Sequence, residues 1–246
     1  MTRKTVSKTE EVCEDGVCRF PNASSDESSL TTSPTRMADV TWRIFRIMAE
    51  FVDGFQFIST HKRDVTVFGS ARLPEDNHWY QEMVRLTRRL GEAGFTIVTG
   101  GGPGIMEAAN KGAYEAGAPS VGINIQLPME QRINPYVTRG KAFYYFFTRK
   151  VIMTASGQAY VFGPGGFGTL DEVFEILTLI QTNKMAAVPV VLMSHDFWDP
   201  LLDFLRATLR DGFETISPED LELFHIVDTA EEAFELIKDS KERSFF

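Results

Sequence analysis

The chain has 246 residues, of which 43% are hydrophobic and 24% charged, which is enough apolar material for one sizeable core. Its formal net charge of -9 argues against a nucleic-acid groove, because polyphosphate backbones are bound by clustered Lys and Arg. A small anionic ligand remains compatible with this charge, since it needs only a local positive site.

The N-terminal segment differs in composition from the rest of the chain. Residues 1–36 are rich in Ser, Thr, Glu and Asp and lack apolar periodicity, so we expect a disordered tail. Cys13 and Cys18 lie there without a neighbouring His or second Cys pair; we expect free thiols rather than a disulfide or a zinc site. No apolar run resembles a signal peptide or a membrane span, so a cytoplasmic protein without membrane contact is expected.

The remaining chain, 37–246, is expected to form a single domain. Ala38 to Ile58 has apolar residues at three and four spacing, which predicts a helix with a wide apolar face. Short β-branched runs predict strands at Val65–Gly69, Thr96–Gly100, Ser120–Ile125, Ala142–Phe147, Ala159–Gly163, Val188–Met193 and Phe224–Val227. Between them, helical periods span Trp79–Ala93, Gly104–Ala116, Leu170–Gln181 and Pro200–Leu209. This alternation predicts a Rossmann-like α/β domain, with an open, mainly parallel β-sheet flanked by helices.

Three of the predicted strands end in glycine-bearing loops, at Gly69–Arg72, Gly100–Gly104 and Gly163–Thr169. Ligands of open α/β sheets collect beyond the carboxyl ends of the strands, so these loops define a cleft. Glycines let backbone approach a ligand closely, and the following helix N-termini favour an anion. The sequence therefore predicts an anion site, with Gly69, Ser70, Gly101 and Gly102 among its nucleotide-binding residues.

The third loop contains a GxGxxG pattern in Gly163, Gly165 and Gly168. A dinucleotide site has this pattern after its first strand and a carboxylate about 20 residues later, and neither feature is found here. No GxxxxGK[ST] occurs, which disfavours a P-loop enzyme. The structural alternative is a plain strand-to-helix turn, with Thr169 and Glu172 as a capping box.

The stretch "PGGFGTLDE" (Pro164–Glu172), preceded by Arg149 and Lys150 in "FFTRKVIM", resembles the PGGxGTxxE signature and RK pair of the LOG family. This family is often labelled lysine decarboxylase-like, and its best characterised members are cytokinin riboside 5'-monophosphate phosphoribohydrolases. The resemblance covers Val65 to Met193. It implies release of a free base and ribose 5-phosphate from AMP or an N6-substituted AMP, without metal or organic cofactor. It also implies a homodimer or higher homo-oligomer.

The resemblance carries site roles onto particular residues of this sequence. Arg149 and Glu172 match the family's catalytic pair. Residues that match its nucleotide-binding positions are Gly165, Gly166, Phe167, Gly168, Thr169, Lys150, Glu130 and Thr178. Without the resemblance, Arg149 would be read as a surface or ion-pair residue, and Glu107 is read as an ordinary first-turn helix carboxylate.

Hydrolysis of an N-glycosidic bond passes through an oxocarbenium-like sugar, whose positive charge a carboxylate stabilises. Glu172 is expected in the first turn of a helix, where the dipole keeps it ionised, so we expect a base or electrostatic stabiliser and not a proton donor. Arg149 is expected to orient the substrate through its planar fork. For protonation of the leaving base, Glu130 and water are candidates.

Two other functions remain open from the sequence. A carrier or sensor could bind a nucleotide or molybdenum cofactor in the same cleft without turnover, as related Rossmann proteins do; retention of both Arg149 and Glu172 favours an enzyme. A pyridoxal-dependent decarboxylase is disfavoured, because Lys150 lacks the surroundings that a Schiff-base Lys requires.

Overall fold

The computed structural model describes residues 12–14, 17–19, 34–126 and 133–242. The chain divides into two compact units, one ending at Phe45 and the other beginning at Arg46, so the division falls within the residues of helix α1 (Pro34–Ile58). In the first unit, β1 (Val12–Glu14) and β2 (Val17–Arg19) pair antiparallel, so short strands occur within the segment expected to be a disordered tail. The expected division into a tail (1–36) and a single domain (37–246) stays a prediction. None of the helices in the described ranges is long and apolar enough to cross a membrane.

The second unit is built on a seven-stranded parallel sheet in the order β6-β5-β4-β3-β7-β8-β9. The strands are β3 (Asp64–Phe68), β4 (Thr96–Thr99), β5 (Ser120–Ile125), β6 (Arg139–Phe143), β7 (Ala159–Phe162), β8 (Val190–Met193) and β9 (His225–Val227). Each strand that the sequence predicts is present, and the Rossmann-like α/β fold is confirmed. The central strands β3 and β7 are buried along their whole length, which explains their continuous apolar character.

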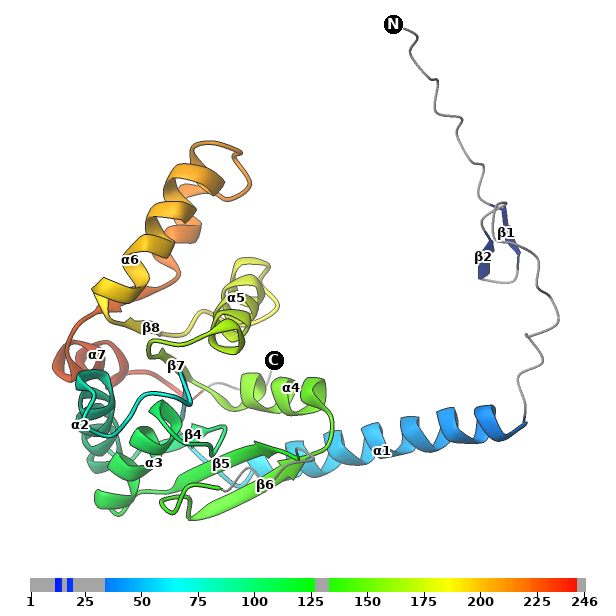
Figure 1. Ribbon diagram of the computed structural model, residues 1–246, viewed down its shortest axis with the longest axis horizontal. Coiled ribbons are helices and arrows are strands. Elements are labelled where there is room, and N and C mark those ends of the chain that lie inside the picture. Colours follow the sequence, from blue (N-terminus) through cyan, green and yellow to red (C-terminus); the bar gives the residue numbers. More distant parts are fainter. Residues whose placement is uncertain (1–11, 15–16, 20–33, 127–132, 243–246) are drawn as a thin grey trace, which may run out of the picture. The chain divides into compact units, whose positions relative to one another are not determined.

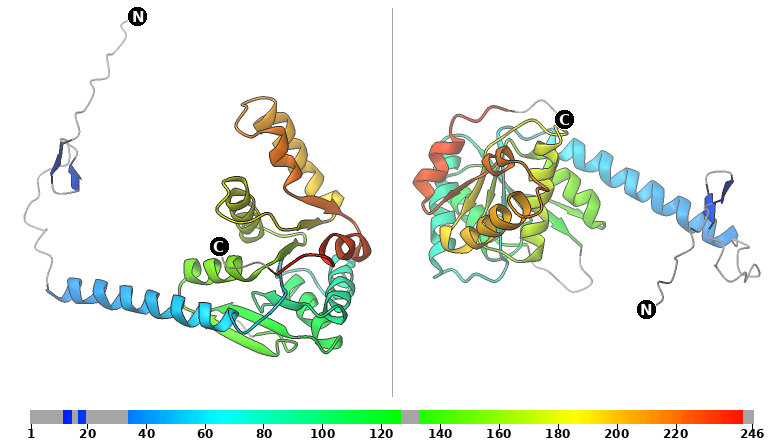
Figure 2. Two further views of the ribbon diagram at one scale, coloured as in Figure 1. Left: turned by 180° about the vertical axis from the view of Figure 1, so that it is seen from behind. Right: turned by 90° about the horizontal axis from the view of Figure 1, so that it is seen from above.

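Helices cover both faces of this sheet (Figure 1). One face packs against α2 (His78–Glu92), α3 (Ile105–Glu115) and α7 (Ala230–Ile237). The other packs against the end of α1, α4 (Phe146–Ser156), α5 (Phe167–Gln181) and α6 (His195–Phe204). Figure 2 shows α6 beside α5, and α6 continues into a π-helical turn at Leu205–Arg210. A 3₁₀ turn at Pro218–Glu222 precedes β9.

Two predicted boundaries are wrong for identifiable reasons. The strand predicted at Ala142–Phe147 is β6 only as far as Phe143, and α4 begins at Phe146. Aromatic residues favour strands, which explains the prediction. In the structure, the carboxylate of Glu50 on α1 accepts hydrogen bonds from the N–H groups of Tyr144 and Tyr145, where the strand ends and the helix follows. Helix α6 begins at His195 and not at Pro200, because Ser194 caps it by accepting a hydrogen bond from the Phe197 N–H.

The strand order reverses between β3 and β7, which makes their carboxyl ends the topological switch point of the sheet. The loops that follow these two strands are joined by a hydrogen bond of 2.9 Å from the Ser70 N–H to the Pro164 carbonyl. The start of α3 is attached to the same loop, since Ile105 N–H donates to the Ser70 carbonyl. Gly104 has a φ of 70°, and a Cβ there would collide with that carbonyl, so this junction requires glycine.

Candidate active site

A cleft of about 1080 Å³ opens beyond the carboxyl ends of the central strands. The loops after β3 and β7, the first turns of α5 and one side of α4 line it. It brings together these residues that the sequence predicted for the site: Gly69, Ser70, Arg149, Lys150, Gly166, Phe167, Gly168, Thr169 and Glu172. The fold therefore gathers the RK pair and the glycine loop at one place.

The glycines before α5 have two different structural settings. A Cβ on Gly165 would collide with the Thr169 side chain, so this glycine makes room for packing inside the loop. A Cβ on Gly166 or Gly168 would meet nothing within 4 Å, and neither residue has a positive φ. Neither side-chain packing nor a positive φ requires glycine at these two positions, so their backbone is open to the cleft.

Helix α5 begins at Phe167, with Gly166 as its N-cap and no capping side chain. The capping box of the structural alternative is therefore not formed, because Thr169 and Glu172 both lie inside the helix and are buried. The N–H groups of the first helical turn have no intrahelical acceptor, and the helix dipole is positive at this end. Since these residues line the cleft, an anion is well accommodated here.

Arg149 reaches the cleft from α4. Burial lowers the pKa of its guanidinium, and the charge of Glu172 opposes this effect. The guanidinium carbon lies 5.7 Å from the centroid of the Phe146 ring. The guanidinium also lies close to the backbone of Gly100, since a Cβ added to that glycine would be 3.3 Å from Arg149 Nη1. Its buried Nε has no hydrogen-bond partner among the described residues. Arg149 can therefore donate hydrogen bonds to a bound anion or hydroxyl.

Glu172 is only 6% exposed and lies in the second turn of α5. Burial raises the pKa of its carboxyl to about 7, although the charges of Lys150 and Arg149 act in the opposite direction. Burial therefore acts against the ionised form that the sequence predicts for this carboxyl. Oε2 is buried and has no hydrogen-bond partner in the described part of the chain. Near neutral pH, Glu172 can accept or donate a proton.

Lys150 is engaged by carboxylates of α5. Its Nζ lies 2.8 Å from Asp171 Oδ2 and 3.2 Å from Glu175 Oε2. These ion pairs connect α4, which carries Arg149, to α5, which carries Glu172. The second basic residue of the RK pair therefore links the two helices of the site.

Other predicted residues lie away from the cleft. Gly101 N–H donates to the Thr99 hydroxyl, and the carbonyls of Gly101 and Gly102 accept hydrogen bonds from Asn134, so this loop is held by the protein itself. Thr178 is exposed farther along α5 and does not line the cleft, and neither does Gly165. Glu130 lies outside the described residues, so its role stays a prediction.

The cleft also contains residues that the sequence analysis did not assign to the site. They are Phe68, Ala71, Arg72, Gly100, Met106, Ile125, Phe146, Phe147, Met153, Leu170 and Asp171. Arg72 ends the predicted Gly69–Arg72 loop, so its position was available from the sequence; it forms no ion pair with any residue within the described ranges. The apolar and aromatic side chains form a wall on which a planar base could stack. In the described ranges, no group of three His, Cys, Asp or Glu residues could hold a metal ion.

The chain is similar to known proteins in sequence and in fold. Residues 106–237 match the model of a family described as "Possible lysine decarboxylase". The cytokinin riboside 5'-monophosphate phosphoribohydrolase LOG of Oryza sativa subsp. japonica is 32% identical over 139 residues, which are 54% of this chain and 57% of that protein. A cytokinin riboside 5'-monophosphate phosphoribohydrolase of Arabidopsis thaliana is 28% identical over 173 residues, or 69% of this chain and 79% of that protein.

Among solved structures, the molybdenum cofactor carrier protein from Chlamydomonas reinhardtii is similar, with a TM-score of 0.53 and 25% identity. That likeness covers 72% of this chain and 96% of the carrier. The matched part of the rice relative is less than two thirds of its length, whereas the family model matches more than half of this chain. The range that the family model matches includes Arg149, Lys150, the glycine loop and Glu172. The chain therefore belongs to this family, the LOG or lysine decarboxylase-like family.

Proposed function

We propose that the chain is an N-glycosidic hydrolase that releases the free base and ribose 5-phosphate from a nucleoside 5'-monophosphate, AMP or an N6-substituted AMP. The observation that carries this proposal is the pair Gly166 and Gly168, whose open Cβ positions at the uncapped start of α5 face a cleft that also holds Arg149 and Glu172. The names of the rice and Arabidopsis relatives support the same reaction.

The groups of the cleft suit the steps of this reaction. The 5'-phosphate accepts hydrogen bonds from the first N–H groups of α5, where the dipole favours an anion. Glu172, in its ionised form, stabilises the oxocarbenium-like ribose and orients the attacking water. The water supplies a hydroxyl to C1' of the ribose, and its remaining proton ends on the leaving base. Arg149, whose Nε has no hydrogen-bond partner among the described residues, donates hydrogen bonds to the sugar phosphate. The proposal requires no metal or organic cofactor.

A comparison of AMP with adenosine tests the phosphate-binding part of the proposal. We expect kcat/KM for AMP to exceed that for adenosine by about 10²-fold or more, because binding energy from the non-reacting phosphate is used at the reacting centre. The two substrates should be followed by release of adenine at equal enzyme concentration. Equal values of kcat/KM would contradict a phosphate site at the start of α5.

A carrier function is the second candidate, and the likeness to the molybdenum cofactor carrier of Chlamydomonas reinhardtii favours it. A carrier needs the anion site of α5 but no group that activates water. Replacing Glu172 by Gln distinguishes the two functions. In an enzyme, the variant should lose the turnover of the wild-type chain and keep nucleotide binding, whereas in a carrier the substitution should change little.

We further propose that the chain forms a homodimer or a larger homo-oligomer. Large apolar side chains are exposed at the mouth of the cleft, with Phe167 at 92%, and Phe146 and Phe147 also exposed on α4. Exposed apolar patches of this kind mark association surfaces. Light scattering of the full chain should give a mass of at least two chains, and the mass of one chain would contradict this proposal.

A further inference from the structure

Helix α4 has no capping side chain of its own, and a side chain from another helix bonds the residues that lead into it. The carboxylate of Glu50, from α1, accepts hydrogen bonds from the N–H groups of Tyr144 (2.6 Å) and Tyr145 (3.3 Å). It also accepts a hydrogen bond of 2.5 Å from the hydroxyl of buried Thr148, in the first turn of α4. Glu50 therefore caps α4 from another helix, and its charge opposes the positive end of the helix dipole.

The same part of α1 contacts the side chains around this cap. The rings of Phe51 and Phe147 have their centroids 6.4 Å apart, and the Arg46 guanidinium lies 5.5 Å from the centroid of the Tyr144 ring. At Gly54 the two helices approach closely, since a Cβ there would lie 2.6 Å from Ile152 Cγ1. The second half of α1 thus contacts α4 at Gly54 as well as at its start.

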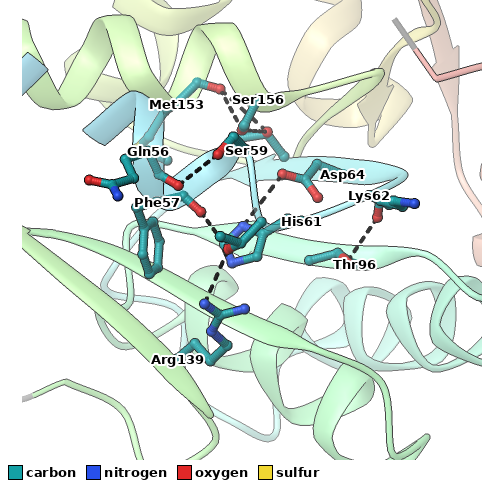
Figure 3. A network of polar contacts seen from close by, with 12 residues as sticks. Gln56, Phe57, Ser59, His61, Lys62, Asp64, Thr96, Arg139, Met153 and Ser156 are labelled. Atoms are coloured by element: carbon teal, nitrogen blue, oxygen red, sulfur yellow. Dashed lines mark hydrogen bonds and ion pairs between the residues drawn. The ribbon is translucent and has the colours of Figure 1, made fainter. Parts of the chain in front are cut away.

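The turn that follows α1 is bonded to the sheet. Figure 3 shows the turn after α1, where His61 Nδ1 lies 3.8 Å from Asp64 Oδ2. Arg139 of β6 donates a hydrogen bond of 3.1 Å to the Thr60 hydroxyl, and the Thr96 hydroxyl donates one of 2.9 Å to the Lys62 carbonyl. The two hydrogen bonds attach the turn to β6 and β4.

We propose that Glu50 is a positioning residue, which holds the start of α4 so that Arg149, with Phe146 and Phe147, is presented to the cleft. Its carboxylate contacts Thr148, the residue directly before Arg149, and the backbone of the two residues before Phe146. Glu50 lies outside the region that the family model matches, so α1 supplies this support from outside the matched core. The part of this inference that concerns turnover rests on the proposed function.

The first test measures the cap itself and does not depend on activity. In Glu50→Ala, amide hydrogen exchange at Tyr144 and Tyr145 should be faster than in the wild-type chain, because their acceptor is lost. Asp53→Ala is the matched control: Asp53 lies one turn farther along α1 and pairs with Lys141 at 2.8 Å, without contacting α4's first turn. Exchange that is unchanged in Glu50→Ala would overturn the proposal.

The second test measures the consequence for the reaction. We expect kcat for AMP to fall about tenfold or more in Glu50→Ala with a smaller change in KM, since small displacements of a catalytic group reduce the rate of the chemical step. Glu50→Gln, which keeps an oxygen acceptor, should recover part of the loss, and Asp53→Ala should keep wild-type kcat. Wild-type kcat in Glu50→Ala would overturn the proposal. If the wild-type chain releases no base, the proposed function fails, whereas the exchange measurement still decides whether Glu50 holds α4.

Discussion

Glu172→Gln is expected to reduce kcat for AMP by about 10²- to 10⁴-fold while nucleotide binding is retained, because the amide can neither carry the charge nor exchange a proton. Binding should be measured by calorimetry with AMP, and turnover by release of adenine. Glu92→Gln, an exposed substitution on α2, is the control that should change neither. A Glu172→Gln protein with wild-type kcat would remove this residue from the chemistry.

The same variant is expected to be more stable than the wild-type chain at alkaline pH. The pKa of Glu172 is raised from 4.5 to about 7, so the folded state holds this proton more tightly than the unfolded state does. The protonated carboxyl therefore makes its full contribution to the free energy of unfolding below pH 4.5, and this contribution is lost as the pH rises through about 7. Glutamine does not ionise, so at pH 8 the variant should gain about 3 kcal/mol at most, and at pH 4.5 little. Urea unfolding at both pH values measures this difference; an equal effect at both would contradict it.

The pH dependence of the reaction separates two roles for Glu172. As an ionised stabiliser of the ribose cation, it requires loss of its proton, so kcat/KM should rise with pH and level off above about 7. A kcat/KM that falls above pH 7 would instead make the protonated carboxyl the donor to the leaving base.

Arg149→Ala is expected to reduce kcat/KM by about 10²- to 10³-fold, the range seen when a donor to the transition state is removed. Arg149→Lys should restore little, because an ammonium lacks the planar fork. The charge of Arg149 lowers the pKa of Glu172, so its removal should also move the rise in kcat/KM to higher pH. Arg206→Ala, exposed on the π-helical turn, serves as the control. A loss of less than threefold in Arg149→Ala would show that Arg149 has only a structural role.

The strands and the glycine loop were predictable from local sequence, because parallel strands buried on both faces are continuously apolar and their connections are marked by glycine. The start of α4 was not, since the aromatic run after β6 becomes helical through Glu50, which is about 95 residues distant in the chain. Such a cap leaves no local pattern.

The differences at the site have a local and a long-range origin. Thr169 and Glu172 fit a capping box by spacing, but Gly166 is the N-cap, so Glu172 lies a turn deeper and is buried. The ionised state expected of a first-turn carboxylate depended on that placement. Gly101 and Gly102 resemble a phosphate loop in sequence, and their carbonyls are bonded to Asn134, which a sequence pattern could not reveal.

The most direct test of the proposed function is incubation of the purified full chain with AMP, GMP, CMP, UMP and N6-isopentenyl AMP, followed by chromatography of free base and ribose 5-phosphate. We predict equal amounts of base and ribose 5-phosphate from AMP or its N6-substituted form, and loss of both products in Glu172→Gln. Absence of base from every nucleotide, while nucleotides still raise the melting temperature, would contradict the hydrolase and favour the carrier.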